Sequence, residues 1–319
     1  MSPGCRTLFV GAVEEGRRCL EAMLADGERF AGIVTLKDDL AAGTSGAVSF
    51  DEIARERGIP LIKVGDLNAE ANIARVREIA PDLVLVIGWT RLLGPALLKM
   101  PRLGCVGFHA SLLPRYRGRA PVNWAIINGE KETGNTMFFL DEGVDTGDII
   151  AQRRIPIAGH DDCATLYRKV ANSAIGMLRE NLPLLKHGRA PRMAQDHSKA
   201  TVMPKRSPED GLIDWSKSSR QLYDWVRALT HPYPGAFSHL EGRRLFVWQA
   251  RDAGSLVAAA GGAGAAGTLL GSDGEDLLVA AGQGAIALRR VQWHGGPEIP
   301  GATLSALSGR RFGGAERTA

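Results

Sequence analysis

A continuous apolar run, Leu83-Val84-Leu85-Val86-Ile87, constrains the fold of this chain more than any other feature. A strand that is apolar at every position has no face to offer to water, so both of its faces must be covered. Such strands occupy the centre of parallel sheets that carry helices on both sides. Since the run stops at Gly88-Trp89, where a turn is expected, it predicts a short central strand of a layered α/β domain.

Strand and helix patterns alternate on either side of this run. Short apolar or β-branched runs predict further strands at Thr7–Gly11, Phe30–Leu36, Pro60–Val64 and Leu103–Phe108. Apolar residues at helical spacing predict helices at Glu15–Asp26, Phe50–Arg57 and Asn72–Ile79. This alternation predicts an open, mostly parallel, Rossmann-like sheet, and such sheets bind ligands just outside the carboxyl ends of their strands. The chemistry is therefore expected in the segments that follow Gly11, Ile87 and Phe108.

The pattern changes after His187, where a polar stretch rich in proline, lysine and arginine predicts a linker over residues 188–211. Beyond it, short strand-like runs separated by glycine-rich turns predict a small β-rich, barrel-like domain over residues 212–308. Within that domain Gly254–Gly267 is mostly alanine and glycine, which predicts a flexible loop, and residues 309–319 are expected to form a flexible tail. The α/β domain is accordingly placed at residues 1–187.

Composition excludes several classes of protein. The cysteines Cys5, Cys19, Cys105 and Cys163 are scattered without close pairing, so neither a disulfide framework nor a zinc site is indicated, and no metal is expected. No apolar run approaches the roughly eighteen residues that a membrane span needs, and the N-terminus lacks the pattern of a signal peptide. A cytoplasmic protein without membrane contact is therefore expected. The net charge of +4 tolerates an anionic ligand without requiring nucleic acid.

The stretch richest in chemistry begins at the end of the strand predicted at Leu103–Phe108. Residues 107–121 read GFHASLLPRYRGRAP, and residues 141–150 read DEGVDTGDII. His109 is placed at a strand end that faces the ligand side of the sheet, where a carboxylate from a neighbouring turn can hold its charged form. The same local pattern fits a half-buried histidine whose ring is satisfied by the backbone. The residues alone leave both interpretations open.

Taken together, these strings resemble the signature of the formyltetrahydrofolate-dependent formyltransferases: H-x-S-L-L-P, then R-G-x-A-P, then D-x-G-x-D-T-G. The resemblance extends from Leu8 to the region of Gly295, because residues 206–215 and 232–237 also match these two-domain enzymes. It is greatest for the branch that formylates UDP-4-amino-4-deoxy-arabinose, and methionyl-tRNA formyltransferase is the next most similar. The resemblance implies an enzyme that transfers a formyl group from N10-formyltetrahydrofolate to a primary amine.

Two catalytic residues, His109 and Asp145, are implied by the resemblance. In the family the histidine manages protons and polarises the formyl group, and the aspartate pairs with it and fixes a water that carries protons. Attack of a neutral amine on a formyl carbon develops an oxyanion and an ammonium together, so one must be stabilised and the other deprotonated. His109 would serve the oxyanion as a cation, and the Asp145 carboxylate would favour that charge.

The resemblance also implies where the folate co-substrate binds, namely against the turn after the central strand and against two later loops. Backbone amides and carbonyls of such loops suit the donor and acceptor edge of a pterin, so the side chains there can vary. Ten residues are expected to contact the folate: Trp89, Arg91, Leu92, Leu93, Leu112, Pro114, Asp141, Glu142, Gly143 and Val144.

One position departs from the family pattern. The family usually has asparagine two residues before the histidine, and this chain has Gly107. The asparagine amide is expected to donate a hydrogen bond to the formyl oxygen, and the loss of one such donor costs about 100-fold or more in rate. Gly107 leaves three interpretations: an altered transferase, a formyltetrahydrofolate hydrolase, or a noncatalytic folate- or nucleotide-binding module.

The acceptor amine is less directly indicated. Three arginines are candidates for binding phosphates of the acceptor: Arg115, Arg117 and Arg119. A basic loop exposed to solvent would have the same sequence. Residues 207–319 hold eleven Lys and Arg and eleven Asp and Glu, whereas a domain that grips tRNA is expected to carry excess positive charge. The run from Arg117 to Trp124 also reads like the amino-sugar branch.

An amine on a nucleotide-linked sugar is therefore the predicted acceptor, and tRNA is the less favoured one. Methionyl-tRNA, another small amine such as hydroxyornithine, and water in a hydrolase stay open as alternatives. An apolar face of the small domain is compatible with a homodimer.

Overall fold

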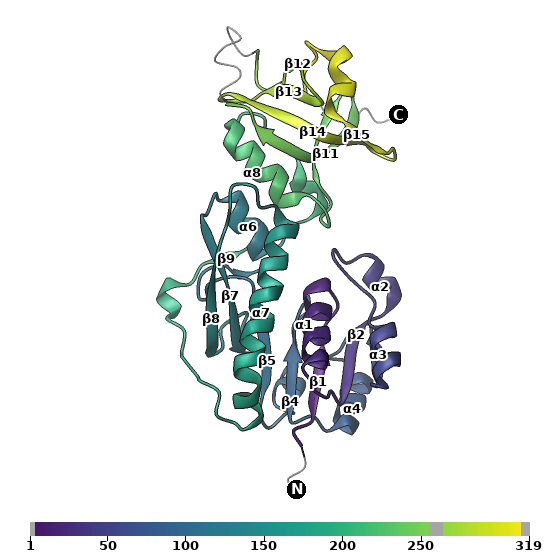
Figure 1. The fold of residues 1–319 in the computed structure, drawn as a ribbon, viewed down its shortest axis with the longest axis vertical. Helices are drawn as coiled ribbons and strands as arrows, with labels where there is room; N and C mark the ends of the chain where they lie inside the picture. Colours follow the sequence, from purple (N-terminus) through teal and green to yellow (C-terminus); the bar gives the residue numbers. More distant parts are fainter. Residues whose placement is uncertain (1–3, 255–263, 314–319) are drawn as a thin grey trace. The chain divides into compact units, whose positions relative to one another are not determined.

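The computed structural model describes residues 4–254 and 264–313, so residues 255–263 of the predicted loop and 314–319 of the predicted tail lie outside the described residues. The chain divides into two compact units (Figure 1). The first comprises residues up to 121 together with 132–156 and 166–204, and the second comprises 122–131, 157–165 and the residues from 205 onward. Residues 188–204, for which the sequence predicts a linker, therefore belong to the first unit.

A seven-stranded sheet with the order β3-β2-β1-β4-β5-β7-β8 forms the centre of the first unit. Its five parallel strands are β1 (Thr7–Val10), β2 (Gly32–Leu36), β3 (Leu61–Val64), β4 (Leu83–Val86) and β5 (Cys105–His109). Two antiparallel strands, β7 (Glu132–Phe139) and β8 (Ile149–Pro156), complete it. The predicted mostly parallel, Rossmann-like sheet is confirmed, and the apolar run of β4 lies between β1 and β5.

Alternate residues of the central strands build two hydrophobic cores, one on each face of the sheet. Phe9 and Leu85 belong to one core, and Leu8 and Val84 belong to the other. Because side chains alternate along a strand, complete burial of β4 requires helices on both faces. The first core is covered by α1 (Glu14–Ala25), α3 (Asp51–Arg57) and α7 (Cys163–Lys186), and the second by α4 (Glu70–Ile79) and α5 (Pro95–Leu98).

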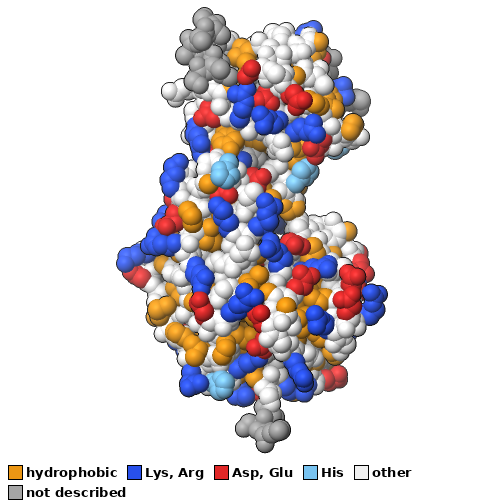
Figure 2. All heavy atoms as spheres, viewed as in Figure 1, with side chains coloured by type: hydrophobic (Ala, Val, Ile, Leu, Met, Phe, Trp, Pro, Cys, Tyr) orange, Lys and Arg blue, Asp and Glu red, His pale blue; other side chains and the backbone are white. Residues whose placement is uncertain are grey.

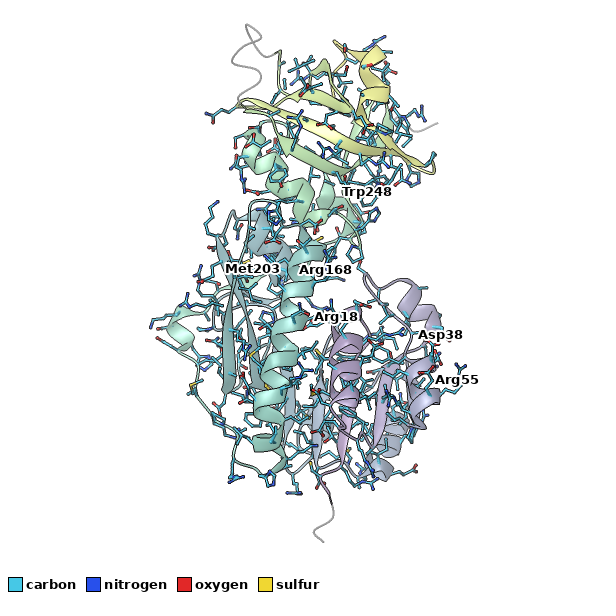
Figure 3. All side chains as sticks on the ribbon, in the orientation of Figure 1. Arg18, Asp38, Arg55, Arg168, Met203 and Trp248 are labelled. Atoms are coloured by element: carbon cyan, nitrogen blue, oxygen red, sulfur yellow. The ribbon has the colours of Figure 1, made fainter. Side chains whose placement is uncertain are left out.

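Short elements complete the first unit. The segment 188–204 ends in β9 (Val202–Met203), which pairs in parallel with β6 (Arg117–Gly118); Figure 3 labels Met203 on this strand. Met193 of the same segment forms a backbone bridge with Ile149 at the start of β8. Helix α2 (Asp38–Ala42) also belongs to the first unit, whereas α6 (Pro121–Ile127) lies almost wholly in the second.

The second unit contains an antiparallel sheet, which confirms the predicted β-rich C-terminal domain, and helix α8. The strand order is β10-β11-β14-β13-β12, and β15 pairs with β14. The strands are β10 (Ala236–Leu240), β11 (Arg243–Asp252), β12 (Leu269–Asp273), β13 (Asp276–Ala280), β14 (Ala285–Trp293) and β15 (Glu298–Pro300).

Helix α8 (Ser219–Leu229) begins at a reciprocal cap that its sequence encodes. The Ser218 hydroxyl accepts from the Gln221 backbone N–H, and the Gln221 side chain accepts from the Ser218 backbone N–H. Farther along the helix the buried carboxylate of Asp224 binds the buried guanidinium of Arg227 at 2.7 Å. The helix therefore carries both a cap and a buried ion pair.

Charged side chains of both signs are interspersed over the face seen in Figure 2. This agrees with the small net charge of +4. Over residues 4–254 and 264–313, none of the helices combines the length and the apolar character that a membrane crossing requires.

Candidate active site

His109 is the last residue of β5, and its ring lies between two hydrogen-bond acceptors. Nε2 is 2.6 Å from the Tyr116 carbonyl oxygen, and Nδ1 is 3.5 Å from Oδ2 of Asp145. Since a carbonyl oxygen only accepts, Nε2 must donate to it. Nδ1 faces the Asp145 carboxylate at a longer distance, so both ring nitrogens have an acceptor on their side.

Asp145 lies between β7 and β8 and reaches His109 through an unusual backbone conformation. Its φ is +54°, in the left-handed region that residues other than glycine seldom adopt. Oδ2 of Asp145 also accepts a 2.8 Å hydrogen bond from the Gly118 backbone N–H. A left-handed backbone costs conformational energy, and the Gly118 amide is one contact from another segment that helps hold Asp145 in it.

The R-G-x-A-P turn meets Asp145 at Gly118, where the structure demands glycine for two reasons. The φ of Gly118 is +98°, and a Cβ atom there would lie 2.6 Å from the Met203 carbonyl oxygen of β9. The backbone of β9 therefore passes too close to this turn for any side chain. The amide that binds Asp145 is held in place by that pairing.

Residues predicted to line the folate pocket differ in their exposure. Trp89 and Leu93 are partly buried against the core of β1 and β4, whereas 64% of Leu92 is exposed. The guanidinium of Arg91 donates to the Gly65 carbonyl oxygen. Nε1 of Trp89 is buried and has no hydrogen-bond partner within the part of the chain that the structure describes. An orphaned donor of this kind marks a position where a ligand acceptor can bind.

The loop Asp141–Val144 is exposed, and its backbone is held open by its own side chains. Oδ1 of Asp141 accepts from the Gly143 N–H at 3.1 Å and from the Thr146 hydroxyl at 2.6 Å. Glu142 pairs with Lys99 at 2.9 Å, which brings the loop beside the segment that follows β4. This ion pair links the loop to the residue that follows α5, which is not one of the predicted folate-binding residues.

Leu112 and Pro114 lie on the chain that leaves β5. The Leu112 side chain packs against the backbone of Gly134 on β7, where an added Cβ would meet it at 2.3 Å. Pro114 follows a cis peptide bond, and its carbonyl oxygen accepts from the Thr201 N–H at 3.3 Å. Both residues are partly buried.

Leu140 fills the space beside Gly107, the position that departs from the family pattern. A Cβ atom on Gly107 would lie 2.7 Å from Cδ2 of Leu140, closer than a normal carbon contact. Gly107 itself lies in β5 and pairs with Phe138 of β7. An asparagine at position 107 would therefore require the Leu140 side chain to move.

The three arginines predicted to bind the acceptor are not equivalent. Arg115 is exposed above the ring of Tyr116, and Arg119 is exposed and donates to the Thr90 carbonyl oxygen at 2.8 Å. Arg117 is buried, with 6% of its surface exposed. It donates to Oε1 of Gln195 at 2.6 Å and to Nδ1 of His197 at 3.0 Å. Its guanidinium is therefore used for hydrogen bonds inside the protein.

Sequence reasoning missed Gln195 and Thr201, which contact the partners of His109. Gln195 is buried and donates to the carbonyl oxygens of Asp145 and Gly147 at 3.0 Å and 2.7 Å. Thr201 accepts from the Tyr116 N–H at 2.8 Å. Both residues lie in a polar stretch without hydrophobic periodicity, so no pattern signalled the burial of Gln195 or the contact that the exposed Thr201 makes with Tyr116.

The ionisable side chains of this site suit acid–base and electrostatic chemistry at His109 and Asp145. Nowhere in the described ranges do three or more His, Cys, Asp or Glu side chains gather as metal ligands would.

Comparison with known proteins identifies the family. Residues 22–182 match the Formyl transferase family, and residues 205–307 match the Formyl transferase, C-terminal domain family. The methionyl-tRNA formyltransferase of Geobacter sulfurreducens is 35% identical over 97% of this chain and 95% of its own length. Three further relatives, 34–36% identical over 92–97% of this chain, are also methionyl-tRNA formyltransferases.

These relatives contradict the prediction of an amino-sugar acceptor. Neither of the two observations behind that prediction requires such an acceptor. Positive and negative residues are equal in number over residues 207–319, so the whole net charge of +4 comes from the residues before them. The charge of 207–319 therefore says nothing about the rest of the surface. Asn123, within the run that reads like the amino-sugar branch, donates to the Ala228 carbonyl oxygen at 2.6 Å in the second unit and is buried there.

Solved structures with the same fold have lower identity. HypX from Aquifex aeolicus, determined with tetrahydrofolic acid, superimposes with a TM-score of 0.68 at 19% identity over 95% of this chain, which spans 47% of HypX. The N-formyltransferase of Helicobacter canadensis, determined with folinic acid and dTDP-3-aminofucose, gives a TM-score of 0.66 at 17% identity over 89% of this chain and 98% of its own. With both parts of its sequence matched and a fold shared with these structures, the chain belongs to the formyl transferase family.

Proposed function

We propose that this protein transfers the formyl group of N10-formyltetrahydrofolate to the amino group of methionyl-tRNA. The observation that carries the proposal is the placement of the His109 ring between the Tyr116 carbonyl and the Asp145 carboxylate. The choice of acceptor is supported by relatives that match nearly the whole chain at about one-third identity and are methionyl-tRNA formyltransferases.

The residues around Trp89 fit an aromatic ligand with a polar edge. Leu92 and Val144 are large apolar side chains that stay 64% and 46% exposed, so their surfaces are available to the apolar part of a ligand. The buried Nε1 of Trp89 offers a donor that the described protein does not use. Trp89, Leu93 and the backbone of Asp141–Val144 would hold the folate, which when bound supplies the formyl group.

His109 has one firmly held and one loosely held ring nitrogen. Nε2 is engaged by the Tyr116 carbonyl at 2.6 Å, whereas the 3.5 Å between Nδ1 and Asp145 exceeds a normal hydrogen bond. Nδ1 is therefore the ring nitrogen that the protein engages less tightly, and it is the one available to a reacting group. As a cation the ring would stabilise negative charge on a formyl oxygen, with the Asp145 carboxylate facing its Nδ1 side.

Exposed arginines near this pair suit a nucleic-acid acceptor. Arg115 and Arg119 follow the H-x-S-L-L-P stretch and remain at the surface. A planar guanidinium binds phosphate oxygens through two parallel hydrogen bonds, so both arginines are candidates for contacts with the acceptor backbone. The buried Arg117 cannot make such a contact.

The proposal is tested by incubating the purified protein with N10-formyltetrahydrofolate and methionyl-tRNA and measuring formylmethionyl-tRNA. Formylation of methionyl-tRNA is expected, with little folate turnover when the acceptor is omitted. Turnover at the full rate without acceptor would identify a hydrolase instead. Formylation of a nucleotide-linked amino sugar in place of methionyl-tRNA would also refute the proposed acceptor.

A further inference from the structure

We propose that residues 195–203 form a positioning clasp that holds both partners of the His109 ring. Gln195 positions Asp145 on the Nδ1 side, and Thr201 positions the Tyr116 carbonyl on the Nε2 side. The inference rests on the proposed catalytic role of His109 and Asp145. It assigns a task in the reaction to a segment whose sequence reads as a linker.

The Gln195 side chain fixes the backbone that presents Asp145. Its amide nitrogen donates to the carbonyl oxygens of Asp145 and Gly147, at 3.0 Å and 2.7 Å, and thus ties both sides of Thr146 to one group. Asp145 has a φ of +54°, an unfavourable backbone conformation that these hydrogen bonds help to maintain. Gln195 is 6% exposed, so water does not compete for these hydrogen bonds.

Arg117 determines which way the Gln195 amide faces. A guanidinium only donates, so the atom of Gln195 that lies 2.6 Å from Nη2 of Arg117 must be the oxygen. The amide nitrogen is then directed at the two carbonyl oxygens, which only accept. The buried Nη2 also donates to Nδ1 of His197, a second residue of the clasp, at 3.0 Å. Arg117 is thus a positioning residue that acts through Gln195.

The other end of the clasp holds Tyr116. The Thr201 hydroxyl accepts from the Tyr116 N–H at 2.8 Å, and the Thr201 carbonyl accepts from the Arg117 N–H at 2.8 Å. β9 then pairs with β6 through Arg117 and Gly118. Tyr116 has a φ of +59°, so the carbonyl that binds His109 also depends on a backbone conformation held from outside.

Both neighbours of the His109 ring therefore depend on one segment of the chain. Release of either end should let the corresponding acceptor move away from its ring nitrogen. Misplacement of a catalytic group by about 1 Å costs on the order of 100-fold in rate, so the Gln195→Met variant should lose about that factor in kcat with a smaller change in KM.

The test uses the full chain labelled with ¹⁵N in its histidines, and it reads the ring nitrogen signals of His109 by NMR at one fixed pH. The His109→Gln variant identifies these signals among the seven histidines. In Gln195→Met the Nδ1 signal should move toward its position in Asp145→Asn. In Thr201→Val the Nε2 signal should move instead.

Gln292→Met is the matched control, because Gln292 is a partly buried glutamine of the second unit with the same two tasks. It accepts from Nε1 of Trp248 at 2.8 Å and donates to the Gly296 carbonyl oxygen at 2.6 Å. This variant should lower stability and leave both His109 signals and the pH profile of kcat/KM as in the wild type.

The clasp is refuted if Gln195→Met behaves like Gln292→Met, with lower stability and unchanged His109 signals. If Gln195→Met does not fold, Gln195→Glu is measured instead. This variant keeps an acceptor for Arg117 and removes the amide N–H groups that donate to Asp145 and Gly147. An unchanged Nδ1 signal in Gln195→Glu would also refute the clasp. The NMR signals need no substrate. A wild type that fails to formylate methionyl-tRNA while Gln195→Met shifts the Nδ1 signal would refute the proposed function and support the clasp.

Discussion

His109 shows how two distant parts of the chain define the chemistry of one residue. The ring is placed by the end of β5, while its partners come from the turn at Tyr116 and from the loop that carries Asp145. A histidine with one acceptor can work as a neutral ring. With acceptors on both sides, the ring has an acceptor for a proton on either nitrogen.

Replacement of either member of this pair should reduce turnover while the protein stays folded. His109→Gln keeps a donor for the Tyr116 carbonyl but cannot become a cation, and Asp145→Asn removes the negative charge. General acid–base groups contribute about 100-fold to 10,000-fold in rate, so kcat should fall at least about 100-fold in each variant. Single-turnover formation of formylmethionyl-tRNA measures this, and a loss below about tenfold in both variants would contradict the expected role of acid–base groups.

Gly107 and Leu140 should behave as a coupled pair in stability. Gly107→Asn forces a side chain into the Leu140 methyl group 2.7 Å away, and overpacking of this kind costs about 1–3 kcal/mol. Leu140→Ala opens the space that the asparagine would fill. Urea unfolding of the two single variants and the double variant should give a favourable coupling of about 1 kcal/mol. Additive single effects would show that the two positions do not compete for one space.

Glu15 should make the stability of the first unit depend on pH. Burial raises the pKa of its carboxyl to about 7. Between the unfolded pKa near 4.5 and the folded value, rising pH removes the proton more easily from the unfolded chain, so stability falls as pH rises through this window. Part of the side chain reaches solvent, so we expect Glu15→Gln to be about 1–3 kcal/mol more stable than the wild type at about pH 8.

Chemical unfolding at about pH 5 and about pH 8 measures this effect of Glu15. The two proteins should differ little at the lower pH, where the glutamate is largely protonated in the folded protein. A stability difference that is the same at both pH values would contradict the assignment.

At the level of elements, the predicted strands and helices of the first unit were recognisable because each carries its own periodic pattern. β1, β2, β3 and β4 coincide with short apolar runs, and α1, α3 and α4 with apolar residues at helical spacing. β9 was not recognisable, because its two residues form a strand only through pairing with β6.

Helix α8 contains a buried cation, Arg227, that is paired with the carboxylate of Asp224 on the same helix. Asp224 and Arg227 have side chains that are 5% and 6% exposed, and Asp224 also binds the more exposed Arg220 at 2.9 Å. Asp224→Ala leaves the Arg227 cation buried without its carboxylate, which should cost about 3–5 kcal/mol of unfolding free energy. The control Arg220→Ala removes only the exposed partner and should cost less than about 1 kcal/mol. Equal losses of stability would refute the buried pair as the cause.

At the scale of the whole molecule, charge is distributed unevenly along the sequence. Residues 207–319 are balanced, so the net charge of +4 arises from the residues before them. The balanced part is the only part whose charge disfavours tRNA. A nucleic acid can be bound by the other part, where Arg115 and Arg119 are exposed.

The affinity for methionyl-tRNA should therefore fall steeply with salt, linearly in a plot of log affinity against log salt concentration. Arg115→Ala should make this slope less steep by about 1, as expected when one phosphate contact is lost. Arg55→Ala serves as the control, because Arg55 is also exposed but lies on α3, at the position that Figure 3 labels. Equal slopes for the wild type and Arg115→Ala would exclude Arg115 from the tRNA contact.

Local patterns in the sequence predicted the parallel strands of the sheet, and the resemblance to a known family named His109 and Asp145 as candidates. Burial of an apolar face needs only a periodic run, so strands such as Leu83–Val86 can be recognised before any contact is known. Only the tertiary structure decided that Gln195 and Thr201 hold the partners of His109 and that Leu140 fills the space at Gly107. Polar contacts and close packing depend on which distant segments of the chain lie together in the fold. Such contacts produce no periodic pattern in the sequence.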